Sequence, residues 1–234
     1  MKETIYKNYQ SRLDESAKSA VSLKSNYTSL SWARVILFVS ATIGFIVFAD
    51  EKNSAAMIIT IAIAIVGYLI LLKRHAKVRF ELKLAQAREQ INSDELRRLN
   101  NDLNDFEDGK KYYNANHPYH EDLDIFGKHS LFQFVNRTST FLGERTLAEW
   151  FGVGASPKAI KERQESALEL SPDIDFRQDF EAFGKANTDT DIDHQPLLDW
   201  LKEDNTLKNS GLYKVLLGIL PLGMITTIVL SSLD

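Results

Sequence analysis

The sequence contains no cysteine among its 234 residues. This absence excludes disulfide bonds, zinc sites with thiolate ligands and a thiol nucleophile, and it agrees with a main body in the cytoplasm. No phosphate-binding loop of the form G-x-x-x-x-G-K-[ST] occurs. The "GVG" at 152–154 lacks the third glycine of a dinucleotide fingerprint, and no serine stands in a G-x-S-x-G elbow. The sequence therefore predicts no catalytic residue and no cofactor-binding residue in this chain.

The segment "HPYHED", residues 117–122, brings two histidines and two acidic residues together. Because Pro118 breaks a helix, the two imidazoles of His117 and His120 lack the helical spacing that would direct both at one metal ion. The segment is therefore interpreted as a polar loop with Tyr119 packed on the body. No metal ligand is predicted.

Apolar residues are concentrated in three runs, at 33–49, 55–72 and 211–230. Each is close to the ~20 residues that a helix needs to cross ~30 Å of hydrocarbon. The second run carries no charge over its 18 residues, which favours a membrane span over a buried core helix. The third run contains Lys214 and Pro221, so both interpretations stay open for it. We expect a transmembrane hairpin over 32–73 and a third transmembrane helix over 211–231.

Basic residues predict the orientation of this hairpin. Lys18, Lys24 and Arg34 precede or begin the first apolar run, and "KRHAKVR" at 73–79 follows the second. The positive-inside rule places both flanks in the cytoplasm and the loop at 50–54 outside. The expected location is a bacterial plasma (inner) membrane, with the N-terminus and main body cytoplasmic and the lipid bilayer as one partner.

No strand pattern appears between the apolar runs, so the fold class is expected to be all-α. A polar helix is expected over 1–31, and the second span should continue into a cytoplasmic helical arm over 74–116. Ser93 is expected to cap a further helix that ends at Gly109. Its apolar stripe would be Leu96, Leu99, Leu103 and Phe106.

A helical body is expected over 117–210. Its helices should begin at the caps Thr140, Ser156 and Ser171, the last two followed by Pro157 and Pro172. The third of these helices should end at Gly184, and a short one should cover 196–204. Apolar residues at helical spacing are expected to face inward: Leu142, Leu147 and Trp150, then Phe176, Phe180 and Phe183.

Two arginines, Arg137 and Arg145, stand in an otherwise apolar helical stretch. They could contact phosphates, or they could form hydrogen bonds that tie helix ends together. Between residues 151 and 211 there are 7 Lys or Arg against 13 Asp or Glu, and an acidic surface repels a nucleic-acid backbone. The charge balance therefore favours the structural interpretation.

The stretch "DLDIFGKHSLFQFVNRTSTFLGERTLAEWF", followed by "IKERQESALEL", resembles the start of the core domain of MutS-family ATPases. Ordered matches over about 50 residues make this resemblance more specific than a short motif. The paired N-terminal apolar runs resemble those of membrane-anchored MutS-related proteins of bacteria. The matching residues are Asp124, Phe126, Gly127, Ser130, Leu131, Phe132, Asn136, Arg137, Thr138, Gly143, Arg145, Leu147, Glu149, Trp150, Ile160, Arg163, Gln164, Glu169 and Leu170.

The resemblance implies a helical MutS-core-like domain over 117–210 and a role in DNA mismatch repair or recombination. It implies an ATPase domain outside this chain, which would bind ATP and Mg²⁺, dimerise and couple to DNA. The chain departs from the family because it has no Phe-x-Glu wedge for mismatched DNA and carries an apolar run where the DNA clamp is expected. The matching residues are therefore expected to be structural.

Two functional hypotheses follow. In the first, the chain is the membrane-anchoring and core segment of a MutS-like ATPase, truncated before its ATPase, so that the chain itself should not hydrolyse ATP. In the second, it is a membrane scaffold whose cytoplasmic helices bind a protein partner, with no role in DNA or ATP chemistry. Direct DNA binding by the core is a third, weaker hypothesis, which the acidic balance disfavours.

Overall fold

The structure is a computed structural model that describes residues 2–187, 195–202, 211, 215–221 and 223. The chain divides into two units, Met1–Ile192 and Asp193–Asp234. The described residues form helices and irregular segments, with no strand among them, as the all-α expectation requires. Helix α7 (Gln195–Lys202) belongs to the second unit and lies where a short helix was expected.

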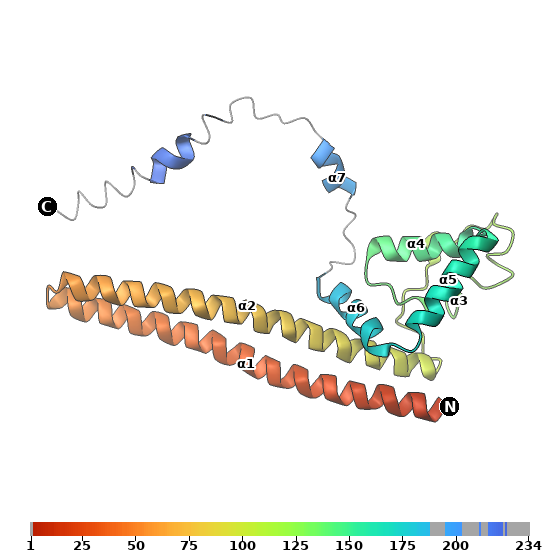
Figure 1. The fold of residues 1–234 in the computed structure, drawn as a ribbon, viewed down its shortest axis with the longest axis horizontal. Helices are drawn as coiled ribbons and strands as arrows, with labels where there is room; N and C mark the ends of the chain where they lie inside the picture. Colours follow the sequence, from red (N-terminus) through yellow and green to blue (C-terminus); the bar gives the residue numbers. More distant parts are fainter. Residues whose placement is uncertain (1, 188–194, 203–210, 212–214, 222, 224–234) are drawn as a thin grey trace. The chain divides into compact units, whose positions relative to one another are not determined.

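Two long helices dominate the first unit. Helices α1 (Lys2–Asp50) and α2 (Ser54–Leu99) run side by side in opposite directions (Figure 1). A short turn joins them, and the Asn53 side chain caps α2 by accepting a hydrogen bond from the Ala56 N–H at 3.1 Å. The polar segment 1–31 and the first apolar run are therefore parts of one uninterrupted helix.

The apolar halves of α1 and α2 present their large side chains outward. Both helices are long and apolar enough to cross a membrane, and their most apolar windows contain no buried residue. A helix that is apolar around its whole surface needs an apolar surrounding, either protein or lipid. The third apolar run lies largely outside the described residues, so its span stays a prediction.

Helix α2 continues far beyond its apolar run, which confirms the predicted continuation. The expected cap at Ser93 is wrong, because α2 passes through this residue and ends at Leu99. Leu96 and Leu103 are buried as expected, but Leu103 and Phe106 lie in the irregular segment after the helix. Nor does Gly109 end a helix; it precedes the short 3₁₀ helix η1 (Lys110–Tyr112).

An aromatic core holds the irregular segment 103–130 together with helices α3 (Leu131–Val135) and α4 (Phe141–Gly152). Its buried members are Ile125, Phe126, Phe132 and Ala148. Gly109 has a φ of 66°, and a Cβ placed there would lie 2.6 Å from Phe132 Cδ1. Glycine is needed here both for the left-handed backbone and for the space that Phe132 occupies.

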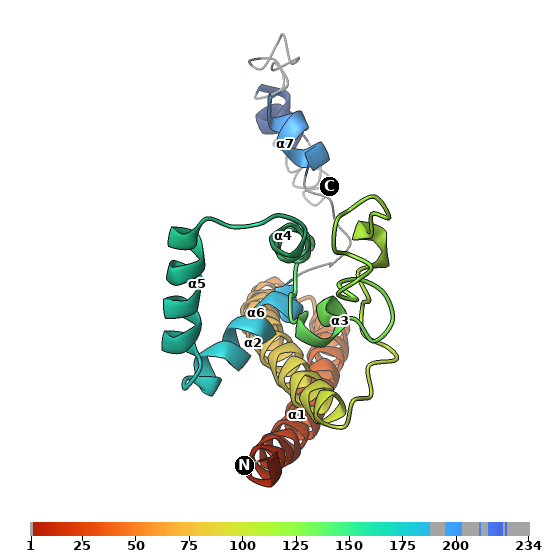
Figure 2. The same cartoon turned by 90° about the vertical axis from the view of Figure 1, so that its right-hand side faces the viewer.

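Helices α5 (Pro157–Leu170) and α6 (Ile174–Asn187) complete the body, and α6 crosses α2 (Figure 2). The predicted caps at Thr140 and Ser156 are confirmed by hydrogen bonds from the N–H groups of Gly143 and Ala159. The predicted cap at Ser171 is wrong, because Asp173 Oδ1 accepts from the Phe176 N–H instead. Helix α6 also continues beyond Gly184 to Asn187.

The predicted apolar stripe of α6 is also wrong. Phe176, Phe180 and Phe183 are exposed, Phe180 by 73%. Helix α6 packs on α2 through Ala182 and Ala186, which are buried against α2. Small side chains allow the two helices to approach closely, so they form the contact face. Phe176 and Phe180 lie outside it, and the half-exposed Phe183 contacts Phe80 of α2 with ring centroids 6.0 Å apart. Leu142 and Trp150 of α4 are likewise exposed, whereas Ala148 is buried.

Candidate functional site

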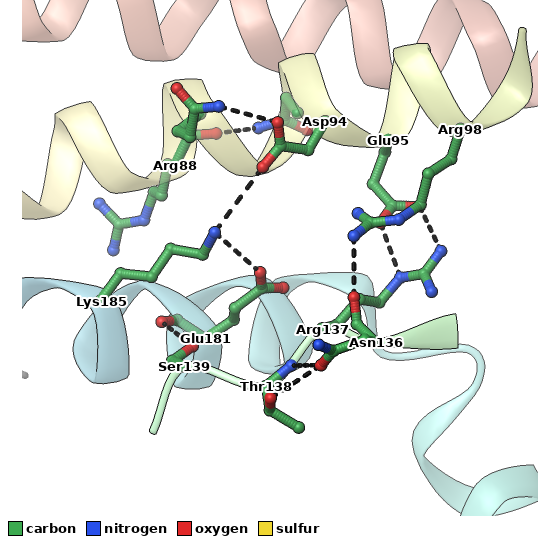
Figure 3. A network of polar contacts seen from close by, with 12 residues as sticks. Arg88, Asp94, Glu95, Arg98, Asn136, Arg137, Thr138, Ser139, Glu181 and Lys185 are labelled. Atoms are coloured by element: carbon green, nitrogen blue, oxygen red, sulfur yellow. Dashed lines mark hydrogen bonds and ion pairs between the residues drawn. The ribbon is translucent and has the colours of Figure 1, made fainter. Parts of the chain in front are cut away.

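A connected polar cluster joins the body to the C-terminal part of α2 (Figure 3). We call it the junction and define it by Asp94, Glu95, Arg98, Asn136, Arg137, Glu181 and Lys185. At its centre Glu95 accepts a bidentate pair of hydrogen bonds from Arg137, at 2.7 Å from Nε and 3.0 Å from Nη2. Such two-point pairs fix orientation as well as distance. Arg137 also donates to the carbonyls of Phe134 and Val135 at the end of α3.

Arg98 forms a second connection to the same segment. Its Nη1 donates to Glu95 Oε1 at 3.2 Å, and its Nη2 donates to the Asn136 carbonyl at 2.8 Å. Its guanidinium lies 4.0 Å from the centre of the Phe106 ring. Burial, followed by the positive charge of Arg137, lowers the pKa of Arg98. Glu95 therefore serves two arginines, one buried and one exposed.

Helix α6 is joined to α2 by the other half of the junction. Lys185 Nζ lies 3.7 Å from Asp94 and 3.5 Å from Glu181. Burial raises the pKa of Glu181, and the nearby Lys185 opposes this effect. Beside the junction, Gln178 donates to Asn92 Oδ1 at 2.7 Å in a fully buried contact.

The segment that links α3 to α4 is held by its own polar groups. Asn136 Oδ1 accepts from the Thr138 N–H at 3.0 Å and from the Thr138 hydroxyl at 2.7 Å. The Ser139 hydroxyl donates to the Glu181 carbonyl on α6 at 3.2 Å. The segment "NRTS" at 136–139 is therefore fixed to both α2 and α6.

The earlier residues of the MutS-like motif build the aromatic core and its turns. Asp124 and Gly127 have positive φ values of 46° and 111°. Ser130 is buried and caps α3 by accepting from the Gln133 N–H, whereas Leu131 is exposed. Phe126 and Phe132 are buried with ring centroids 5.4 Å apart. These residues shape the chain rather than gather reactive groups.

The later motif residues lie on α4 and α5. Gly143 donates its N–H to Thr140 Oγ1 at the start of α4, and Leu147 is half-buried against the aromatic core. Arg145 is exposed and lies 3.6 Å from Glu149 one turn later. The Arg163 guanidinium of α5 stacks over the exposed Trp150 ring at 3.9 Å, and Gln164 is exposed. The motif residues thus form three local groups and no single site.

The two histidines of the 117–122 loop lie together. Their rings stack with centroids 3.7 Å apart, and His117 Nε2 donates to the Gly152 carbonyl at 2.7 Å. Burial, followed by the charge of His117, lowers the pKa of His120. Tyr119 packs against the aromatic core and donates to the Phe151 carbonyl, as predicted. Within the residues that the structure describes, no group of three or more metal-ligating side chains occurs.

The junction balances three acids, Asp94, Glu95 and Glu181, against three bases, Arg98, Arg137 and Lys185. Its chemistry is that of a rigid connection, because paired charges cross-link α2, the 136–139 segment and α6. Sequence analysis identified Asn136 and Arg137 but missed Glu95 and Arg98, since a helix start was expected at Ser93, within what is α2. Their i, i+3 spacing was the only available signal.

Comparison with protein-family models, with curated proteins and with solved structures found no match to this chain.

Proposed function

We propose that this chain anchors a cytoplasmic helical body to a membrane, and that the body is the core segment of a MutS-related ATPase. The observation that supports the anchor best is the continuity of the hairpin. Helix α2 runs unbroken from outward-facing apolar residues at 55–72 to the junction at Asp94–Arg98. A single helix that spans both environments would transmit displacement between them.

The orientation rests on charge. The turn between the helices, 51–53, contains one basic residue, Lys52, whereas Lys73, Arg74, Lys77 and Arg79 follow the second apolar run. By the positive-inside rule, the junction and the loop that carries His117 and His120 lie in the cytoplasm of a bacterial cell. The assignment to a MutS-related ATPase rests only on the ordered residue matches between this sequence and the start of the MutS core domain. ATP, Mg²⁺, DNA contacts and dimerisation would belong to a domain outside these 234 residues.

The absence of cysteine allows a direct topology experiment. Single substitutions Glu51→Cys, in the loop, and Glu162→Cys, on the exposed side of α5, would be labelled in intact bacteria with a membrane-impermeant maleimide. We expect labelling of Glu51→Cys in intact cells, and of Glu162→Cys only after lysis. Labelling of both in intact cells would refute the orientation, and recovery of the chain in the soluble fraction would refute the anchor.

The family assignment needs separate experiments. The purified chain should show no ATP turnover above that of a mock purification. If the chain is part of a longer MutS-related protein, the gene should continue into a domain with G-x-x-x-x-G-K-[ST]. An ATPase activity that follows the purified chain, or an unrelated continuation of the gene, would refute this part of the proposal.

A second function, a scaffold that binds a protein partner, is favoured by one specific observation. Trp150, Phe176 and Phe180 were expected in the core and are exposed instead, each on a helix of the body. Exposed aromatic side chains of this size are enriched where proteins bind one another. Stoichiometric co-purification of a partner, lost on Phe176→Ser and Phe180→Ser substitution, would favour the scaffold over the ATPase segment.

A further inference from the structure

A groove lies between α1 and α2 where their apolar runs meet their polar continuations. Its volume is about 550 Å³. Each helix contributes one stripe at helical spacing: Asn26, Ser29, Leu30 and Ala33 from α1, and Arg74, Lys77, Val78 and Glu81 from α2. Ala33 begins the first apolar run, and Arg74 follows the end of the second by two residues. The groove therefore occupies the level at which the proposed membrane would end.

The groove carries positive charge that the protein leaves largely unpaired. Of its lining residues, Arg74 and Lys77 are basic and exposed, and the exposed Lys73 and Arg79 lie nearby on α2 outside the lining. Lys77 lies 3.8 Å from Glu81 in an exposed pair, which contributes little. Among the described residues, Arg74 has no ion pair and no hydrogen-bonding partner for its side chain. An anion in the groove would therefore meet an available guanidinium.

At the same level of the hairpin, α1 and α2 are in direct contact. His75 is buried on α2 with its ring centroid 4.3 Å from that of Tyr27, the two rings tilted by 34°, and Ser31 Oγ and Arg34 Nη2 each lie 3.3 Å from its Nε2. These contacts hold α1 and α2 at a fixed spacing beside the groove. The site is thus formed by two packed helices and does not depend on a loop.

We propose that this groove binds the headgroup of an anionic phospholipid, with Arg74 and Lys77 as the phosphate contacts. The inference rests on the proposed membrane anchor. Asn26 and Ser29 add hydrogen-bonding groups to the polar rim, while Leu30, Ala33 and Val78 provide an apolar wall for the start of an acyl chain. A free phosphate ion would contact only the polar rim, whereas a phospholipid would contact the rim with its headgroup and the apolar wall with its acyl chain.

The experiment is native mass spectrometry of the full chain in detergent, titrated with phosphatidylglycerol or with phosphatidylcholine. We expect preferential retention of phosphatidylglycerol, and about 30-fold weaker binding of it in the Arg74→Gln/Lys77→Gln variant. The matched control is Lys158→Gln/Lys161→Gln, which removes the same charge from exposed positions on α5 and should bind as the wild type does. Equal binding of the two lipids by the wild type, or equal loss in the control, would overturn the proposal.

A third variant separates binding from misfolding. Glu81→Gln removes the acid that faces Lys77, so it should tighten phosphatidylglycerol binding, an effect that a damaged fold would not produce. Millimolar inorganic phosphate should leave lipid binding unchanged, and competition by it would show a general anion site instead. Carbonate extraction of the same variants reports the anchor independently. A chain that stays in the membrane but shows no lipid preference refutes this inference alone.

Discussion

The apolar hairpin and the aromatic core use the same kinds of residue in opposite ways. Along 33–72 the large apolar side chains point outward, and Phe38 is 73% exposed. Around η1 and α3 a few aromatic residues are turned inward, and Phe132 has no exposed surface. The difference shows that the body buries its apolar side chains and that the hairpin does not. The body supplies its own apolar surrounding through turns, whereas the hairpin needs one from outside.

The largest expected effect is a contrast between two phenylalanines. Phe132→Ala should lower the free energy of unfolding of the body by about 3–5 kcal/mol, because it removes buried contacts and leaves a cavity. Phe38→Ala deletes the same atoms from an exposed position and should cost less than about 1 kcal/mol in detergent. Thermal or denaturant unfolding of both variants measures the contrast. Similar losses would show that the hairpin face is buried against protein.

Insertion of the hairpin into a membrane is tested by placing a charged side chain in its second apolar run. Ile63→Arg should weaken membrane insertion by about 2.5–3.5 kcal/mol, because Ile63 lies in the middle of the second apolar run. Val153→Arg, at an exposed site after α4, is the control and should leave insertion unchanged. The fraction of chain that resists carbonate extraction reports both variants. Unchanged retention of Ile63→Arg would place that run outside the bilayer.

Two junction residues should contribute differently to stability: Glu95, which pairs with two arginines, and Arg137, which is one of those two. Glu95→Ala should destabilise the body by about 2 kcal/mol, because it leaves the buried Arg98 without its carboxylate. Arg137→Ala removes only the exposed partner and should cost about 1 kcal/mol or less. Denaturant unfolding of the two variants and of the double variant measures the coupling. Equal losses of unfolding free energy in the two single variants would argue that Glu95 stabilises the body through Arg137 alone.

The smallest expected effect is a pH dependence that belongs to the body. Burial raises the pKa of Glu181 above its ordinary value of 4.5, so the folded state holds this proton more strongly than the unfolded state does. The stabilising contribution is complete below pH 4.5 and is lost as the pH rises through the raised pKa. The stability of wild type relative to Glu181→Gln should therefore be greater at pH 4 than at pH 7. A difference that grows toward pH 7 would contradict the assigned cause.

Local signals in the sequence were sufficient where the physical cause is itself local. The hairpin follows from two apolar runs separated by five residues, and the starts of α4 and α5 follow from Thr140 and Ser156, which cap the nearest free N–H groups. Tyr119 and the turn around Pro118 were predicted for the same reason. Side-chain type and spacing within one turn decide these features.

Local residue patterns could not predict which face of a helix packs on its neighbour. Phe176, Phe180 and Phe183 form a regular stripe, yet α6 uses Ala182 and Ala186 because only small residues let it approach α2 closely. Asp94 and Glu95 follow an expected helix start at Ser93, yet they lie within α2. These two residues and Arg98 pair with residues about 40 to 90 positions later.

The sequence by itself determined the all-helical class, where the apolar hairpin lies and the capping side chains Thr140 and Ser156. Each depends on the residues in a short window of the chain. Only the tertiary structure decided that Glu95 serves two arginines, that Asn136 and Arg137 connect the body to α2, and that basic and apolar stripes of two helices form one groove. Those features depend on the distance between segments that are far apart in sequence, and that distance is set by packing.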